Sequence, residues 1–137
     1  MITISHLDHV VLRVTNLAAM MDFYSGVLGC PVEKVQADIG LYQLRAGSAL
    51  IDLVPIDGAL GAKGGAAPGP EGRNLDHFCL RVEPFDADAI IAHLRVHDAE
   101  PAPVASRYGA EGQGPSIYVA DPEGNVVELK GPPGPVG

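Results

Sequence analysis

One eight-residue stretch occurs twice in this chain, and this repeat limits the possible folds more than any other feature. Leu7–Val14 reads LDHVVLRV and Leu75–Val82 reads LDHFCLRV, with six of the eight positions identical. Each copy is followed by a polar break, a helix-like run and extended segments, which indicates two copies of one supersecondary unit. We therefore predict an α+β chain built from two βαβββ modules.

Each copy of the repeat has one apolar and one mixed face, because successive side chains of a strand point to opposite sides. His9 and Arg13 share the mixed face of the first copy, and His77 and Arg81 share that of the second. The opposite faces are wholly apolar and require a helix packed on them. We expect the chemistry of the protein on the mixed faces.

The chain is expected to form a single domain over residues 1–137, with a first module over about 4–56 and a second over about 75–130. Glycine, alanine and proline are frequent between the modules, which indicates a linker over 57–74. The end of the chain, 131–137, has nothing to bury, so we expect a loose tail.

Periodicity and turn signals place the elements within each module. Thr15 or Asn16 is expected to cap the first helix, which runs to about Leu28, and Asp86 is expected to cap the second. The glycine-rich stretch 108–115 reads as a mobile loop at the rim of the site. Extended segments are predicted over 4–14, 31–40, 41–46 and 48–56 in the first module, and over 75–82, 101–107, 116–120 and 126–130 in the second.

Composition excludes some partners. With 17 acidic and 9 basic residues the net charge is −8, which disfavours nucleic acid and anionic membrane surfaces. No stretch approaches the ~20 apolar residues that span a bilayer, and the start lacks a basic and apolar leader, so we expect a cytoplasmic protein. Cys30 and Cys79 lack metal or redox spacing and are expected as free buried thiols, with a disulfide as the open alternative.

Four stretches together resemble the vicinal oxygen chelate superfamily: the two LDH repeats, FYSGVLG at 23–29 and YVADPEGNVVEL at 118–129. The superfamily includes glyoxalase I, bleomycin-resistance proteins, fosfomycin-resistance enzymes, methylmalonyl-CoA epimerase and ring-cleaving dioxygenases. The resemblance covers nearly the whole chain. It implies paired βαβββ modules that form a cupped mixed sheet, with the helices on its outer face.

Carried over position by position, the resemblance implies one divalent metal ion held by His9, Asp52, His77 and Glu128. The residues support this set, because two histidines at equivalent repeat positions and a glutamate between apolar neighbours supply ligands for borderline metals. Superfamily members usually have Glu, Gln or His where this chain has Asp52, so direct ligation and a role through water both stay open. Such ligands accept Zn, Ni, Mn, Co or Fe.

Three further side chains are expected on the mixed faces. Tyr118, Arg13 and Arg81 are predicted to contact the substrate. The alternative for Tyr118 is packing, and for the two arginines it is salt bridging.

The resemblance implies lyase or isomerase chemistry like that of glyoxalase I. The metal would act as a Lewis acid that stabilises an enolate of a small-molecule substrate, with Asp52 or Glu128 as the base. Two alternatives stay open. Two histidines and one carboxylate suit an Fe(II) ring-cleaving dioxygenase, and the acidic charge suits a bleomycin-resistance-like protein that binds a cationic drug. The resemblance also implies a homodimer.

Overall fold

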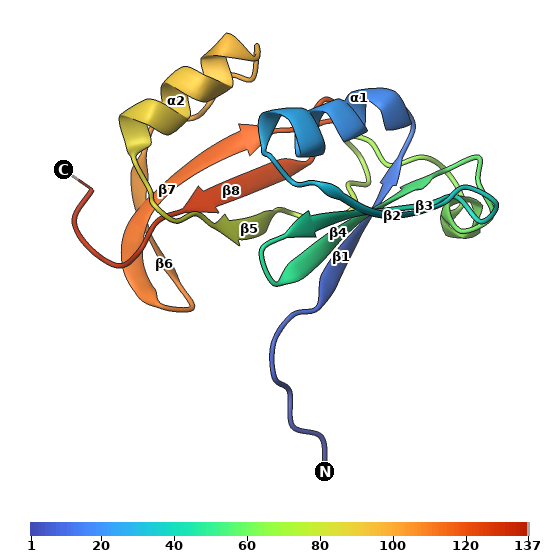
Figure 1. The fold of residues 1–137 in the computed structure, drawn as a ribbon, viewed down its shortest axis with the longest axis horizontal. Coiled ribbons are helices and arrows are strands. Elements are labelled where there is room, and N and C mark those ends of the chain that lie inside the picture. Colours follow the sequence, from blue (N-terminus) through green and yellow to red (C-terminus); the bar gives the residue numbers. More distant parts are fainter. Residues whose placement is uncertain (137) are drawn as a thin grey trace. The chain divides into compact units, whose positions relative to one another are not determined.

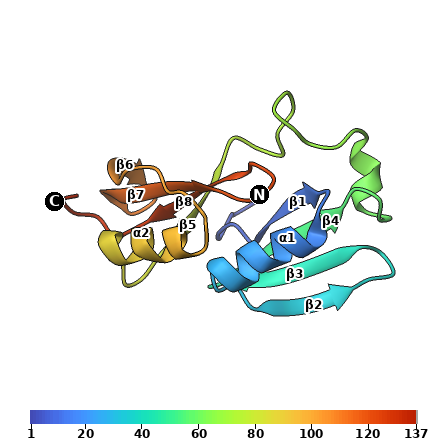
Figure 2. The same cartoon turned by 90° about the horizontal axis from the view of Figure 1, so that it is seen from above.

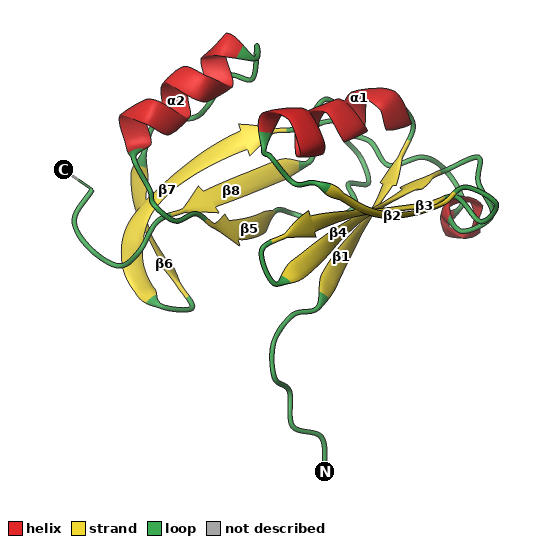
Figure 3. Cartoon of the chain, viewed as in Figure 1, coloured by secondary structure: helices red, strands yellow, loops and turns green. Residues whose placement is uncertain are grey.

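The computed structural model describes residues 1–136. The chain divides into two compact units, Met1–Pro68 and Gly69–Gly137, and each unit contains one four-stranded mixed sheet. In each unit a strand is followed by a helix and then by three strands (Figure 1; Figure 3). This order confirms the predicted α+β fold of two βαβββ modules.

The first unit has the sheet order β1-β4-β3-β2, with β1 parallel to β4 and the other pairs antiparallel. Helix α1 lies over one face of this sheet (Figure 2). The elements are β1 (His9–Val14), α1 (Leu17–Met21), the π-helical turn η1 (Asp22–Val27), β2 (Val32–Gln36), β3 (Leu41–Ala46) and β4 (Ala49–Pro55).

The core of the first unit joins the apolar face of β1 to the helix, as the repeat predicts. The predicted cap Asn16 is confirmed, since its side-chain oxygen accepts a hydrogen bond of 3.1 Å from the backbone N–H of Ala19. A fully buried apolar side chain contributes about 1.5–3 kcal/mol, so this layer stabilises the sheet that positions the mixed face. Its buried members include Leu12, Val14, Met20, Phe23, Tyr24, Leu44, Ile51 and Leu53.

The second unit repeats this arrangement with the sheet order β5-β8-β7-β6 and with β5 parallel to β8. The predicted cap Asp86 is confirmed, since its Oδ1 accepts a hydrogen bond of 3.1 Å from the N–H of Ala89. Leu94 of the helix is buried together with Ile117, Val119 and Val127 of the sheet. The elements are β5 (Phe78–Arg81), α2 (Ala87–Val96), β6 (Ala105–Gly109), β7 (Gly112–Ala120) and β8 (Val126–Lys130).

The first strand is shorter than predicted. It begins at His9 rather than near residue 4, and the backbone bond from Leu50 N–H to the carbonyl of Asp8, 3.1 Å, lies at its start. Ile2, Ile4 and Leu7 are exposed. Since β4 begins at Ala49 and is parallel to β1, it has no earlier residues with which the residues before His9 could pair.

The predicted mobile loop over 108–115 is wrong, because β6 and β7 form a hairpin that turns at residues 110–111. Glycine is required here by packing rather than by flexibility. A Cβ at Gly109 would lie 2.6 Å from Cε of Lys130, and a Cβ at Gly114 would lie 2.5 Å from the carbonyl oxygen of Pro132. Since these neighbours come from the end of the chain, the local sequence did not reveal them.

The tail is attached through residue 134, so the predicted loose tail is wrong over this stretch. The N–H groups of Gly131 and Gly134 donate hydrogen bonds of 2.9 Å to the carbonyls of Pro115 and Gln113 in β7. The last residue of the predicted tail, Gly137, lies outside the described residues.

The segment between β4 and β5 contains a short 3-10 helix, η2 (Gly61–Gly64), and an isolated bridge between Gly69 and Gly72. The division between the two units falls within it, after Pro68. That the two units form one domain stays a prediction.

Both cysteines are free, which confirms that part of the prediction. Cys30 is buried, but Cys79 is exposed, so its predicted burial is wrong.

Among the helices of residues 1–136, none is long and apolar enough to cross a membrane.

Candidate functional site

The strand register places one carboxylate beside each repeat histidine. In the first unit β1 pairs Val11 with Asp52, and in the second β5 pairs Cys79 with Glu128. Each carboxylate therefore lies opposite the residue two positions after the histidine, on the face that the histidine shares. The structure thus gathers the predicted metal ligands as two equivalent pairs, one in each unit.

The pair in the second unit is in direct contact. Nε2 of His77 lies 3.3 Å from Oε1 of Glu128, whose residue is only 6 % exposed. The other carboxylate oxygen, Oε2, accepts a hydrogen bond of 2.6 Å from the hydroxyl of Ser116. Glu128 is therefore fixed with one oxygen facing the imidazole.

The aspartate that precedes each histidine binds Nδ1 of the ring. The distance from Nδ1 to the Asp Oδ2 is 2.8 Å for Asp8 and His9, and 2.5 Å for Asp76 and His77. A carboxylate accepts a hydrogen bond from Nδ1–H, so a neutral ring keeps its lone pair on Nε2. This is the partner that metal-binding histidines usually have on their second nitrogen.

In that tautomer the contact between His77 and Glu128 joins two hydrogen-bond acceptors. Nε2 and Oε1 then face each other at 3.3 Å without a hydrogen between them. A cation that binds both atoms satisfies both. The imidazole and carboxylate donors therefore fit a borderline divalent metal ion.

In the first unit the residue Asp52 is 4 % exposed, and its carboxylate accepts a hydrogen bond of 3.2 Å from the amide of Gln43. The hydrogen bond that His9 donates to Asp8 raises the pKa of His9, and the nearby charge of Asp52 raises it further. Because the neutral ring binds metal, a proton competes with a metal ion for His9 over a wider pH range than usual.

Tyr118 lies on the mixed face of the second unit, as predicted. It pairs with Glu128 across β7 and β8, and its ring meets the His77 ring edge to face with centroids 5.4 Å apart. Burial raises the pKa of the Tyr118 phenol, and the charge of Glu128 raises it further. The phenol therefore stays protonated near neutral pH and can donate a hydrogen bond.

The guanidinium of Arg13 binds backbone carbonyls of the segment after β4. Its Nε donates to Gly61 at 2.8 Å, Nη1 to Ala66 at 2.9 Å and Nη2 to Gly65 at 2.6 Å. These contacts attach the segment to β1. The predicted contact of Arg13 with a substrate stays a prediction.

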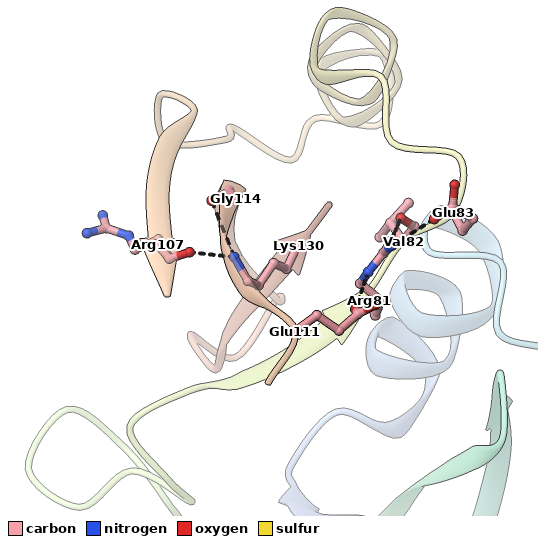
Figure 4. A network of polar contacts seen from close by, with 7 residues as sticks. All are labelled: Arg81, Val82, Glu83, Arg107, Glu111, Gly114 and Lys130. Carbon is pink, nitrogen blue, oxygen red and sulfur yellow. Dashed lines mark hydrogen bonds and ion pairs between the residues drawn. The ribbon is translucent and has the colours of Figure 1, made fainter. Parts of the chain in front are cut away.

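Arg81 forms salt bridges, which was the alternative considered for it. Its Nε donates to Glu111 at 2.6 Å and its Nη2 to Glu83 at 2.8 Å, while Nη1 donates to the carbonyl of Val82 at 2.5 Å (Figure 4). A substrate anion would compete with two carboxylates for this side chain. A substrate contact of Arg81 also stays a prediction.

Sequence reasoning missed three residues of this face. Lys130 is buried, and its Nζ donates to the carbonyls of Arg107 at 2.6 Å and Gly114 at 3.3 Å (Figure 4). Ser116 holds Glu128, and the side chain of Arg107 lies over the Tyr118 ring, with Cζ 5.0 Å from the ring centroid. Alternation with Tyr118 would have found Ser116, and alternation with Glu128 would have found Lys130. No local signal marks Arg107.

Within residues 1–136 no group of three or more His, Cys, Asp and Glu side chains is gathered closely enough to hold a metal ion. Each unit, taken by itself, provides one imidazole and one carboxylate of the predicted set.

A family profile described as Glyoxalase/Bleomycin resistance protein/Dioxygenase superfamily matches residues 6–129. Among solved structures, a virulence protein from Salmonella typhimurium is 22 % identical, with a TM-score of 0.79, covering 96 % of this chain and 100 % of the other. The antibiotic-binding protein TnmS3 from Streptomyces sp. CB03234 is 23 % identical, with a TM-score of 0.66 and coverages of 97 % and 100 %. Lactoylglutathione lyase from Agrobacterium tumefaciens is 22 % identical, with a TM-score of 0.65 and coverages of 93 %. At these identities the three structures share the fold with this chain.

Proposed function

Because this chain belongs to the Glyoxalase/Bleomycin resistance protein/Dioxygenase superfamily, we propose that it is a metal-dependent enzyme. Its substrate would be a small molecule with two adjacent oxygen atoms, and its reaction would be that of a lyase or isomerase. The observation that carries this proposal is the pair of His77 and Glu128, in which Nε2 and Oε1 face each other at 3.3 Å.

We assign the metal-binding role to His9, His77 and Glu128. Both histidines have Nδ1 bound by the preceding aspartate, which leaves Nε2 for a ligand. Ser116 holds the carboxylate of Glu128 through a short hydrogen bond of 2.6 Å, and such support is typical of metal-binding carboxylates. Zn, Ni, Mn, Co and Fe all suit this ligand set.

We assign the role of the base to Asp52. Its hydrogen bond from Gln43 is 3.2 Å long, so its carboxylate is held less tightly than that of Glu128. A group that accepts a proton from carbon and returns it must be able to change its hydrogen bonds. The metal ion, when bound, supplies Lewis-acid stabilisation of the negative charge that develops on substrate oxygen. Tyr118 donates a hydrogen bond to the substrate from its protonated phenol.

The first test is the metal content of protein purified without an affinity metal, measured by mass spectrometry. Wild type and His93→Ala are expected to retain the divalent metal ion, and His77→Ala is expected to lose it. His93 is a suitable control because it lies on α2 and its ring contacts that of His97, with centroids 4.6 Å apart. Wild-type protein that takes up no metal would overturn the proposal and favour a ligand-binding protein.

The second test measures turnover. Deuterium exchange from the solvent into small 2-hydroxycarbonyl compounds, followed by NMR, reports proton transfer at carbon without requiring the natural substrate. Asp52→Asn is expected to keep the metal and lose exchange by about 100-fold or more, as for a general base. Loss of the metal in this variant would instead make Asp52 a ligand. Oxygen uptake with a catechol and Fe(II) would establish the dioxygenase alternative.

A homodimer stays an expectation, and light scattering tests it.

A further inference from the structure

Arg107 differs from the other arginines of the chain in what its guanidinium contacts. Each of the others donates a hydrogen bond to a carboxylate or a backbone carbonyl. Among residues 1–136, the guanidinium of Arg107 has no such acceptor and lies instead over the ring of Tyr118, at 5.0 Å from Cζ to the centroid. The arginines with acceptors are Arg13, Arg45, Arg73, Arg81 and Arg95.

The strand register places Arg107 on the same face as the His77 and Glu128 pair. Arg107 pairs with Gly114 across β6 and β7, and Gly114 shares its face with Tyr118, four residues further along the strand. Tyr118 in turn pairs with Glu128. The ring of Tyr118 contacts both the imidazole of His77 and the guanidinium of Arg107, so Tyr118 connects the two side chains.

The other cations of this face are already engaged. Arg81 binds two carboxylates, and the amine of Lys130 is buried against the carbonyls of Arg107 and Gly114. In Figure 4 the guanidinium of Arg107 extends away from both of these contacts, while its backbone carbonyl accepts the bond from Lys130. Arg107 is exposed and has no acidic partner among residues 1–136, so it is the cation of this face that is available to an anion, even though the net charge of −8 disfavours anions at longer range.

We propose that Arg107 binds a carboxylate or a similar compact oxyanion of the substrate, on the side of Tyr118 away from the metal ligands. This inference rests on the proposed function and adds a substrate class to it: an anionic molecule whose charged group lies a short distance from its two adjacent oxygens. The Tyr118 ring holds the guanidinium above its face. The N–H donors of the guanidinium form no hydrogen bond within residues 1–136 and are available for bidentate binding.

The test compares two metal-binding probes that differ by one charge, using the metal-loaded full-length protein. Acetohydroxamic acid provides two adjacent oxygens without a carboxylate, and succinic acid monohydroxamate provides the same two oxygens with one. Calorimetry is expected to give wild type about tenfold tighter binding of the carboxylated probe, which is in the range of a charge-assisted hydrogen bond. Arg107→Met is expected to lose this preference and to keep its affinity for acetohydroxamic acid, whereas Arg107→Lys is expected to keep part of it.

Arg95→Met serves as the matched control, because Arg95 is exposed on α2 and paired with Glu100. It should keep the wild-type preference. Equal binding of both probes by wild type, or a preference that survives in Arg107→Met, would overturn the role of Arg107 while leaving the proposed metal site intact. Failure of the wild-type protein to bind acetohydroxamic acid at all would count against the proposed function itself and would remove the basis for this inference.

Discussion

The hydroxyl of Ser116 donates a hydrogen bond of 2.6 Å to Oε2 of Glu128, the carboxylate oxygen that does not face His77. Removing this bond in Ser116→Ala frees the carboxylate to rotate and leaves Oε2 without its donor. Loss of such a supporting contact typically weakens metal binding 10- to 100-fold. We expect that decrease in a competition assay with a fluorescent chelator, and little change in the circular dichroism spectrum.

Ser106→Ala is the control for this prediction. Ser106 lies on β6 of the same hairpin, and its hydroxyl accepts a hydrogen bond of 2.8 Å from Gln113 rather than contacting Glu128. Its metal affinity should equal that of wild type. Equal losses in the two serine variants would mean that the hairpin, and not the bond to Glu128, determines the affinity.

The second prediction concerns the pH dependence of His9. The hydrogen bond that His9 donates to Asp8 raises the pKa of His9 above its ordinary value of 6.5. Asp8→Asn removes the negative acceptor, so the pKa is expected to fall toward 6.5. The neutral ring, which is the form that binds metal, would then persist to lower pH. NMR titration of the ring protons in metal-free protein measures this, with Asp38→Asn as a control in an exposed turn. An unchanged midpoint in Asp8→Asn would contradict the prediction.

The third prediction concerns the thiol of Cys79. Although Cys79 is exposed by its surface area, partial desolvation of its thiol raises the pKa of Cys79 to about 11, and the charge of Glu128 adds to this effect. Since only the thiolate reacts, alkylation by iodoacetamide at pH 7 should be at least about tenfold slower than for an ordinary thiol. The rate should continue to rise above pH 9. Measuring it by mass spectrometry in a Cys30→Ser background isolates Cys79, and a plateau below pH 9 would contradict the prediction.

A fourth prediction compares two glycines of the first unit. A Cβ at Gly61 would lie 1.9 Å from the carbonyl oxygen of Pro55, whereas a Cβ at Gly26 would meet nothing within 4 Å. Gly61→Ala must shift backbone and is expected to lower the free energy of unfolding by about 1–3 kcal/mol. Gly26→Ala, in a helical turn, should raise it by about 0.4–1 kcal/mol. Denaturant unfolding measures both values, and equal effects would show that the close contact at Gly61 relaxes without cost.

A fifth prediction separates the predicted contact of Arg13 with a substrate from its observed contacts with residues 61–66. Its three bonds to carbonyls of residues 61–66 indicate that Arg13→Met should loosen this segment. Amide hydrogen exchange is expected to become faster there, while affinity for the carboxylated hydroxamate should stay within about twofold of wild type. A large loss of that affinity with unchanged exchange would restore Arg13 to its predicted role in substrate binding.

The parts of the fold that depend on neighbouring residues were predicted well from the sequence. Asn16 and Asp86 cap their helices, and β3 has the predicted bounds of residues 41–46. Between the segments predicted over 116–120 and 126–130, Oδ1 of Asp121 accepts hydrogen bonds from the N–H groups of Glu123 and Asn125. Each of these features is determined within a few residues, so composition and spacing were sufficient.

The errors arose where distant residues decide the outcome. The hairpin of β6 and β7 resembled a flexible loop because the residues that require glycine there, Lys130 and Pro132, follow about twenty positions later. In the same way, the carbonyl acceptors of Arg13 and one carboxylate partner of Arg81, Glu111, lie far along the chain. Arg107 was missed because it stands out only by having no acidic partner among residues 1–136, and the sequence does not show which side chains are paired.

The bond between each repeat histidine and the aspartate before it has a consequence for the divergence of the two halves. Because the supporting residue is adjacent in the chain, duplication of the module copied the imidazole together with the group that orients it. The carboxylates are placed by strand pairing instead, and their supports differ, with Gln43 in one half and Ser116 in the other. A substitution at either support therefore alters the carboxylate of that half while the histidine keeps the aspartate that orients it.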